Sequence, residues 1–148
     1  MASPRIDFHS GMADKVAYAC RLLRKATAQG AQVVVCGDSA SLDRLDQALW
    51  TFEALAFVPH LRLRRNAAAP AARLARTATW LVDDIQATPH RGVLVNLGPQ
   101  VATGFEQFER VIELVGDDAA DRDAGRQRWR HYLQQGLTVV NHEQGATA

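Results

Sequence analysis

The chain has 148 residues, of which 47% are hydrophobic and 22% are charged, a composition that fits one globular domain over residues 1–148. Its formal net charge of +1 excludes a global basic field of the kind that attracts nucleic acid, so any charge argument must be local. No apolar run approaches the roughly 18 residues that a membrane span requires, and we expect a soluble, cytoplasmic protein.

The first elements are a strand and a helix. Ile6 and Phe8 alternate with polar neighbours and predict a short strand that stops at Gly11. Apolar residues then cluster on one side of a helix predicted over residues 12–29. Gly30 stands where helices commonly end in the left-handed conformation.

A second strand and helix follow directly. The stretch AQVVVCGD, residues 31–38, holds three consecutive valines, which is typical of a strand covered on both faces in a parallel sheet. Asp38 or Ser39 is expected to cap the next helix by accepting hydrogen bonds from its free amide groups. That helix continues into RLDQALWTFEALAFVPH, where three apolar residues keep helical spacing: Leu45, Leu49 and Phe52.

Residues 61–78 are rich in arginine and interrupted by Pro70, and they predict an irregular, exposed segment. A turn of helix around Phe105 and Phe108 is expected to lead into a strand at Arg110. The remaining elements are strands at 79–82, 91–98 and 108–115 and a helix from about Asp118 to Gln135 that Gly136 ends. This alternation predicts a three-layer α/β fold, a mainly parallel sheet flanked by helices, like a Rossmann-type nucleotide-binding domain.

The loops lack the motifs of nucleotide enzymes and hydrolases. The loops HSGMAD and CGDSAS hold one glycine each, whereas a dinucleotide fingerprint needs several and a P-loop needs a Gly-Lys-Ser/Thr end. Ser39 after Gly37 does not complete a GxSxG elbow. The sequence therefore predicts no catalytic activity and no cofactor.

Metal and redox chemistry are not indicated either. Asp83 and Asp84 are adjacent carboxylates, but a turn after a strand explains them better than a metal site. The histidines are scattered, without the paired spacing that presents two imidazoles to zinc. Cys20 and Cys36 have no CxxC spacing and no signal peptide precedes them, so we expect two buried thiols.

The predicted last helix carries a basic face. Its members, at spacings of three, four and seven residues along one side, are Arg122, Arg126, Trp129, Arg130 and Leu133. Arg128 points elsewhere. Three interpretations are open: a solvated face whose arginines pair with nearby acids, a pocket for an acidic peptide that ends in a hydrophobic residue, or stacking of single-stranded nucleic acid on Trp129. The acids in reach are Asp118, Asp121, Asp123 and Glu113.

Two stretches resemble a known family. RLDQALWTFEALAFVPH (44–60) and VIELVGDDAADRDAGRQRWRHYLQQG (111–136) are similar to segments of the chi subunit of bacterial DNA polymerase III, and the length and order of elements also match. The resemblance implies a non-enzymatic adaptor that links the clamp-loader complex to single-stranded-DNA-binding protein (SSB). Direct binding of single-stranded nucleic acid is the alternative.

The resemblance also implies two binding surfaces. The acidic carboxyl-terminal tail of SSB is expected to bind at Val115, Arg122, Arg126, Trp129 and Arg130. Arg122 and Arg130 stand where the family pattern has lysine, and Trp129 where it has tyrosine, so charge and aromaticity are kept. The psi subunit is expected to bind at Trp50, Phe57 and Pro59, although both aromatic side chains would otherwise fit as part of the core.

Overall fold

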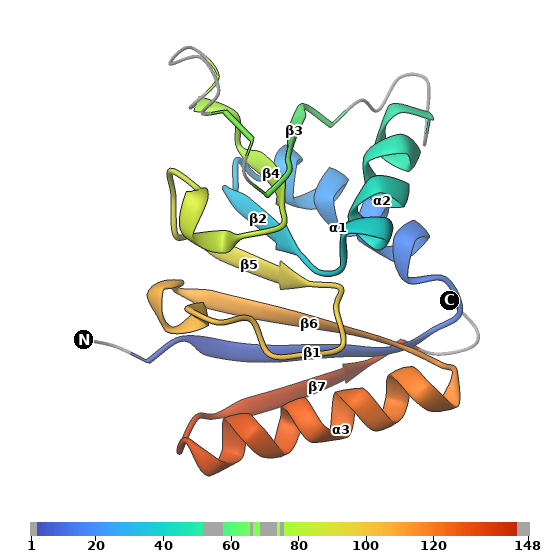
Figure 1. Ribbon diagram of the computed structural model, residues 1–148. Coiled ribbons are helices and arrows are strands. Elements are labelled where there is room, and N and C mark those ends of the chain that lie inside the picture. The colour runs from blue at the N-terminus through green and yellow to red at the C-terminus, as the bar shows by residue number, and fades with distance from the viewer. Residues whose placement is uncertain (1–2, 52–57, 66, 69–73, 75, 145–148) are drawn as a thin grey trace.

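The computed structural model describes residues 3–51, 58–65, 67–68, 74 and 76–144, and the statements below refer to them. Seven strands, three α-helices and two short 3-10 helices follow the chain order in Figure 1. They are β1 (Arg5–Met12), α1 (Lys15–Ala28), β2 (Val33–Cys36), α2 (Ser39–Thr51), β3 (His60–Leu63), β4 (Thr79–Val82), η2 (Ile85–Ala87), β5 (Val93–Asn96), η3 (Phe105–Gln107), β6 (Arg110–Gly116), α3 (Ala119–Gln134) and β7 (Val139–Glu143).

The strands form one seven-stranded sheet in the order β3-β4-β2-β5-β6-β1-β7. Every neighbouring pair is parallel, so the predicted α/β fold with a mainly parallel sheet is confirmed. Parallel neighbours need crossover connections, which here include the helices α1, α2 and α3. None of the described helices is long and apolar enough to cross a membrane.

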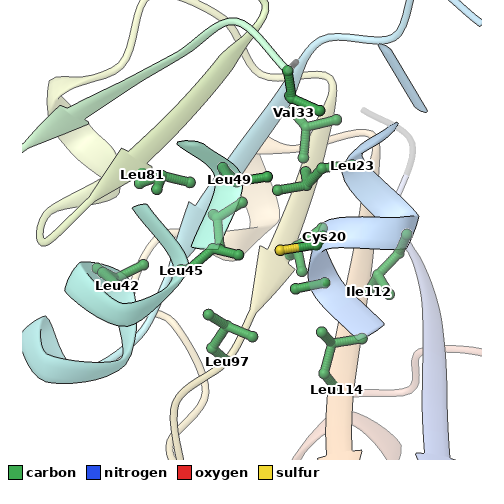
Figure 2. Packing of buried hydrophobic residues seen from close by; sticks show 14 of the residues in the cluster. Cys20, Leu23, Val33, Leu42, Leu45, Leu49, Leu81, Leu97, Ile112 and Leu114 are labelled. Carbon is green, nitrogen blue, oxygen red and sulfur yellow. The ribbon is translucent and has the colours of Figure 1, made fainter. Parts of the chain in front are cut away.

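Helices cover both faces of the sheet. Leu23 of α1 and Leu45 of α2 belong to a cluster on one face that also holds Ile112 and Leu114 of β6, as Figure 2 shows. Tyr132 of α3 packs on the other face, together with the aromatic residues around η3. The valines of β2 divide between the two clusters, which confirms that this strand is buried on both sides.

The first connection differs from the prediction. The strand does not stop at Gly11 but runs to Met12, with an irregular register after Ser10, and the helix begins only at Lys15. Asp14 sets this start because its side chain accepts a hydrogen bond from the Ala17 amide, at 3.1 Å. Met12 is 5% exposed and belongs to the core. Its burial explains why this apolar residue was assigned to the buried side of the predicted helix.

Residues 60–63 correct the expectation of an irregular segment, since they form the edge strand β3 beside β4. The alternating arginines made this strand look like an exposed loop in the sequence. Arg62, whose side chain is only 7% exposed, pairs with Asp43 at 3.0 Å and with Asp83 at 2.8 Å. An arginine that is buried between two carboxylates therefore occupies a position that looks like solvent-exposed loop in the sequence.

The strand β7 was also missed. It follows α3 after Gly136, whose φ of 76° ends the helix as predicted, and it pairs with β1 at the edge of the sheet. Only Val139 and His142 are half-buried and the other residues of the strand are exposed, so the segment VVNHE carries no long apolar run. The predicted helical turn at Phe105 and the strand start at Arg110 are both confirmed.

A buried polar cluster joins α3 to the sheet. Arg128 of α3, 2% exposed, donates from Nε to Glu113 Oε1 at 2.8 Å. The Tyr132 hydroxyl and the Asn96 amide also donate to the Glu113 carboxylate, which is wholly buried. Burial raises the pKa of Glu113, while the charge of Arg128 and these donors oppose that shift.

A second polar cluster lies where β1 meets β7. His9 Nδ1 is 2.6 Å from the Tyr18 hydroxyl, and the rings of His9 and His142 are 5.3 Å apart. His142 Nε2 is 3.1 Å from the buried Asp7 carboxylate, which also pairs with Arg110 at 2.9 Å. Burial, then the charges of His142 and Arg110, holds the pKa of His9 below its ordinary value of 6.5.

Replacing Arg128 should destabilise the fold strongly. Arg128→Met leaves the Glu113 carboxylate buried without its cation, and we expect a loss of roughly 3–5 kcal/mol in the free energy of unfolding, measured by denaturant titration. Arg126→Met changes the same residue type in the same helix at an exposed position and should cost less than about 1 kcal/mol. Equal losses in the two variants would contradict a structural role for the buried pair.

Stability should fall as the pH drops below neutrality. In the unfolded chain His9 takes up a proton near its ordinary pKa, whereas in the folded chain its pKa is lower. Between these two pKa values the unfolded state therefore binds more protons. This contribution is fully present above about pH 6.5 and is lost progressively as the pH falls from there through the lower pKa of His9 in the folded state. His90, whose pKa burial also lowers, adds in the same direction. His9→Gln should flatten the pH profile of the unfolding free energy between pH 7 and 5, and an unchanged slope would contradict this assignment.

Candidate functional site: a basic pocket beside the last helix

A pocket of about 710 Å³ opens at the carboxyl ends of β1, β6 and β7, on the face that α3 covers. Each predicted tail-binding residue lines it: Val115, Arg122, Arg126, Trp129 and Arg130. The carboxyl edge of a parallel sheet is where α/β proteins usually bind ligands, because the strand ends and the following loops meet there.

The helix α3 supplies the basic wall. Asp118 caps its amino end by accepting a hydrogen bond from the Asp121 amide at 3.2 Å. From this start, Arg122, Arg126 and Arg130 recur every fourth residue and share one face of the helix. All three are exposed, and all three line the pocket.

The floor of the pocket is apolar. The half-buried Trp129 ring lies 5.0 Å from the ring of Phe8 on β1, with Val115 at the end of β6. Gly125 allows this arrangement because a Cβ at that position would lie 2.9 Å from Val115 Cγ2. The glycine thus lets α3 approach β6 closely, and no larger residue fits without a shift of the helix or of Val115.

The acids near α3 are mostly engaged elsewhere. Asp121 pairs with Lys15 at 3.1 Å and accepts a hydrogen bond from the Gly116 amide at 2.6 Å. Glu113 is buried with Arg128, and Asp118 caps the helix. Only the exposed pair of Arg126 with Asp123, at 2.6 Å, matches the interpretation of a self-neutralised face. Within the described chain, Arg122 and Arg130 take part in no ion pair.

The wall opposite α3 was not foreseen, because it belongs to the missed strand β7. Ser10 donates from Oγ to Asn141 Oδ1 at 2.9 Å, and Glu143 and Gln144 continue this wall towards the strand end. The two valines after Gly136 were the available signal for a strand here, but the exposed residues that follow them interrupt the pattern.

The second predicted surface lies at the other side of the sheet. Trp50, near the end of α2, is 62% exposed, so it does not close the core. Its ring lies 5.2 Å from the ring of His60, which contacts Asp46 at 2.9 Å and the Val58 carbonyl at 2.6 Å. Pro59 is exposed beside them, and Phe57 lies outside the described residues. Figure 1 shows this end of α2 far from α3.

Another cavity, of about 610 Å³, lies at the carboxyl ends of β2, β4 and β5, where a nucleotide would be expected. Asp38, Asp83 and Asp84 line it, and carboxylates repel phosphate groups. Asp38 caps α2 through the Ser41 amide, at 3.0 Å, and Asp83 holds Arg62. The described residues contain no group of three or more potential ligands placed to hold a metal ion.

The chain matches proteins of one family along most of its length. Residues 3–140 match the model of the family described as DNA polymerase III chi subunit, HolC. The DNA polymerase III subunit chi of Pseudomonas aeruginosa is 34% identical over 145 residues, covering 93% of this chain and 95% of that protein. The subunit chi of Escherichia coli is 25% identical over 121 residues, covering 81% and 79%. The chain therefore belongs to the DNA polymerase III chi subunit family.

Proposed function

We propose that this protein is a non-catalytic adaptor of the replicative polymerase, which binds the acidic tail of SSB in the pocket beside α3 and the psi subunit at the Trp50 surface. The observation that carries the proposal is the meeting of all five predicted tail-binding residues around one pocket. The adaptor would act in the cytoplasm. It would do so as one domain over residues 1–148, in line with a sheet whose strands run from residue 5 to residue 143.

The chemistry of the pocket suits a peptide that ends in a hydrophobic residue. A terminal side chain would pack on Trp129 and Phe8, where apolar area is already exposed to the cavity. The adjoining carboxylate would accept charge-assisted hydrogen bonds from Arg126 or Arg130. Guanidinium groups donate in a planar fork that matches a carboxylate, so arginine at these positions favours directional pairing.

The pocket suits a peptide better than single-stranded nucleic acid. Asp117 and Glu143 lie on its lining together with the arginines. A nucleic acid brings one phosphate with every nucleotide and would meet these carboxylates, whereas a peptide can place uncharged groups beside them. The formal net charge of +1 adds no long-range attraction for a polyanion.

The psi subunit would bind at the opposite side of the sheet. An exposed tryptophan is a frequent anchor of protein interfaces, because its large ring buries much apolar area at low entropic cost. The Trp50 ring lies against the ring of His60, tilted by 58°, and His60 in turn contacts Asp46 and Val58. Pro59 and Phe57 would extend this surface. Both partners would then bind at once, since the two surfaces lie on different edges of the sheet.

Removing one guanidinium should weaken tail binding. We expect Arg126→Ala to reduce the affinity for the last ten residues of the cognate SSB by roughly fivefold or more, about 1 kcal/mol, because a charge-assisted hydrogen bond is lost. Isothermal calorimetry measures this, with a peptide lacking its two terminal residues as the non-binding reference. Arg21→Ala, an exposed arginine on α1, is the matched control and should bind normally.

Two results would contradict the tail site. Equal affinities of Arg126→Ala and the unchanged protein would remove Arg126 from it. Retention of the unchanged protein on single-stranded oligonucleotides in the absence of SSB, without binding of the peptide, would favour the nucleic-acid alternative instead.

Truncating Trp50 should abolish most of the psi interaction. We expect Trp50→Ala to weaken binding of purified psi by about 2 kcal/mol or more while tail binding stays normal. Leu133→Ala removes another large apolar side chain that is 52% exposed, on α3, and serves as the control. If psi bound both variants equally well, Trp50 would not be its anchor.

A further inference from the structure

The two ends of the pocket beside α3 differ in charge. The helix runs back along the sheet from the strand ends, since Val115 approaches Gly125 and, further in, Phe8 meets Trp129. The inner end therefore holds Trp129 together with Arg130, whereas Arg126 follows Gly125 and lies between the two ends, at the level of Val115. The outer end holds Arg122 together with two carboxylates, Asp117 and Glu143.

Glu143 is held firmly at this outer end. Ser10 and Glu143 are register partners of β1 and β7, and the next amide, Gln144 N, donates to the Ser10 carbonyl at 2.7 Å. The side chain passes beside Gly11, where a Cβ would lie 3.6 Å from Glu143 Cγ. In the described part of the chain, the exposed Glu143 carboxylate forms no ion pair, so its charge acts on whatever enters the cavity.

We propose that Glu143 is a specificity-determining residue of this pocket, which disfavours acidic groups of a bound peptide at the outer end. The proposal rests on the proposed function, since it concerns how the same pocket reads an acidic tail. The peptide terminus binds at Trp129 between Arg126 and Arg130. The residues that precede it pass the outer end, where the carboxylate of Glu143 counteracts the attraction of Arg122.

Simple electrostatics supports this role. Two like charges in a partly solvated cavity repel each other at separations within a Debye length, about 10 Å at moderate ionic strength. A peptide acid beside Arg122 gains one attraction and suffers one repulsion, and Arg126 already pairs with Asp123 at 2.6 Å. An acid beside Arg130, at the inner end with Trp129, lies further along the strands from Glu143. The pocket thus favours one direction and one register of the chain, at some loss of affinity.

The test compares two variants and two peptides by calorimetry. Glu143→Gln removes the charge and keeps the shape. Glu109→Gln makes the same change of net charge at an exposed site before β6, at the other end of the strands. One peptide is the ten-residue acidic tail of the cognate SSB, and the other carries amides in place of its acids. Thermal unfolding of each variant checks that the fold is kept.

We expect Glu143→Gln to bind the acidic peptide on the order of threefold to tenfold more tightly and the amide peptide equally well. Adding Arg122→Ala should remove that gain, and Glu109→Gln should show none. Binding by the unchanged protein with no gain in Glu143→Gln, or the same gain for both peptides, would overturn the role of Glu143 alone. Failure of the unchanged protein to bind the acidic peptide would overturn the proposed function, and this proposal with it.

Discussion

The buried pair of Arg128 and Glu113 fixes α3 against the sheet, and the pocket depends on where that helix lies. A charge pair that is removed from water needs hydrogen-bond partners for all of its polar atoms. Here Tyr132 and Asn96 supply the further donors to the carboxylate. The helix then cannot slide without breaking several bonds at once. The exposed arginines of α3 and Trp129 are therefore held in one position relative to β1 and β7.

The parallel sheet separates the two proposed binding surfaces. Its order places β3 at one edge and β7 at the other, so Trp50 and the basic pocket are divided by the width of the sheet. The core between them is packed on both faces of the sheet, so the two edges have little freedom to move relative to each other. Such a scaffold suits a protein that holds two partners at once, because neither occupies the space that the other needs.

The sequence predicted those elements whose patterns follow from burial alone. The valines of β2 and the spacing of α3 gave correct elements because burial on both faces, or on one helical face, leaves a clear period. The two edge strands show no such period in their sequences. β3 hides Arg62 between two carboxylates, and β7 exposes Asn141 and Glu143, so both looked like loops. The pocket wall at β7 followed only from the three-dimensional pairing with β1.

The position of β1 has a consequence for how the molecule is made. This first strand lies between β6 and β7, so residues 5–12 pair only with residues 110–116 and 139–143. Pairing across such long sequence separations is slow, and during synthesis β1 has no neighbour until almost the whole chain has left the ribosome. The pocket is thus among the last features to form. A chain cut short before β7 would carry all three arginines and still lack the wall that Asn141 and Glu143 form.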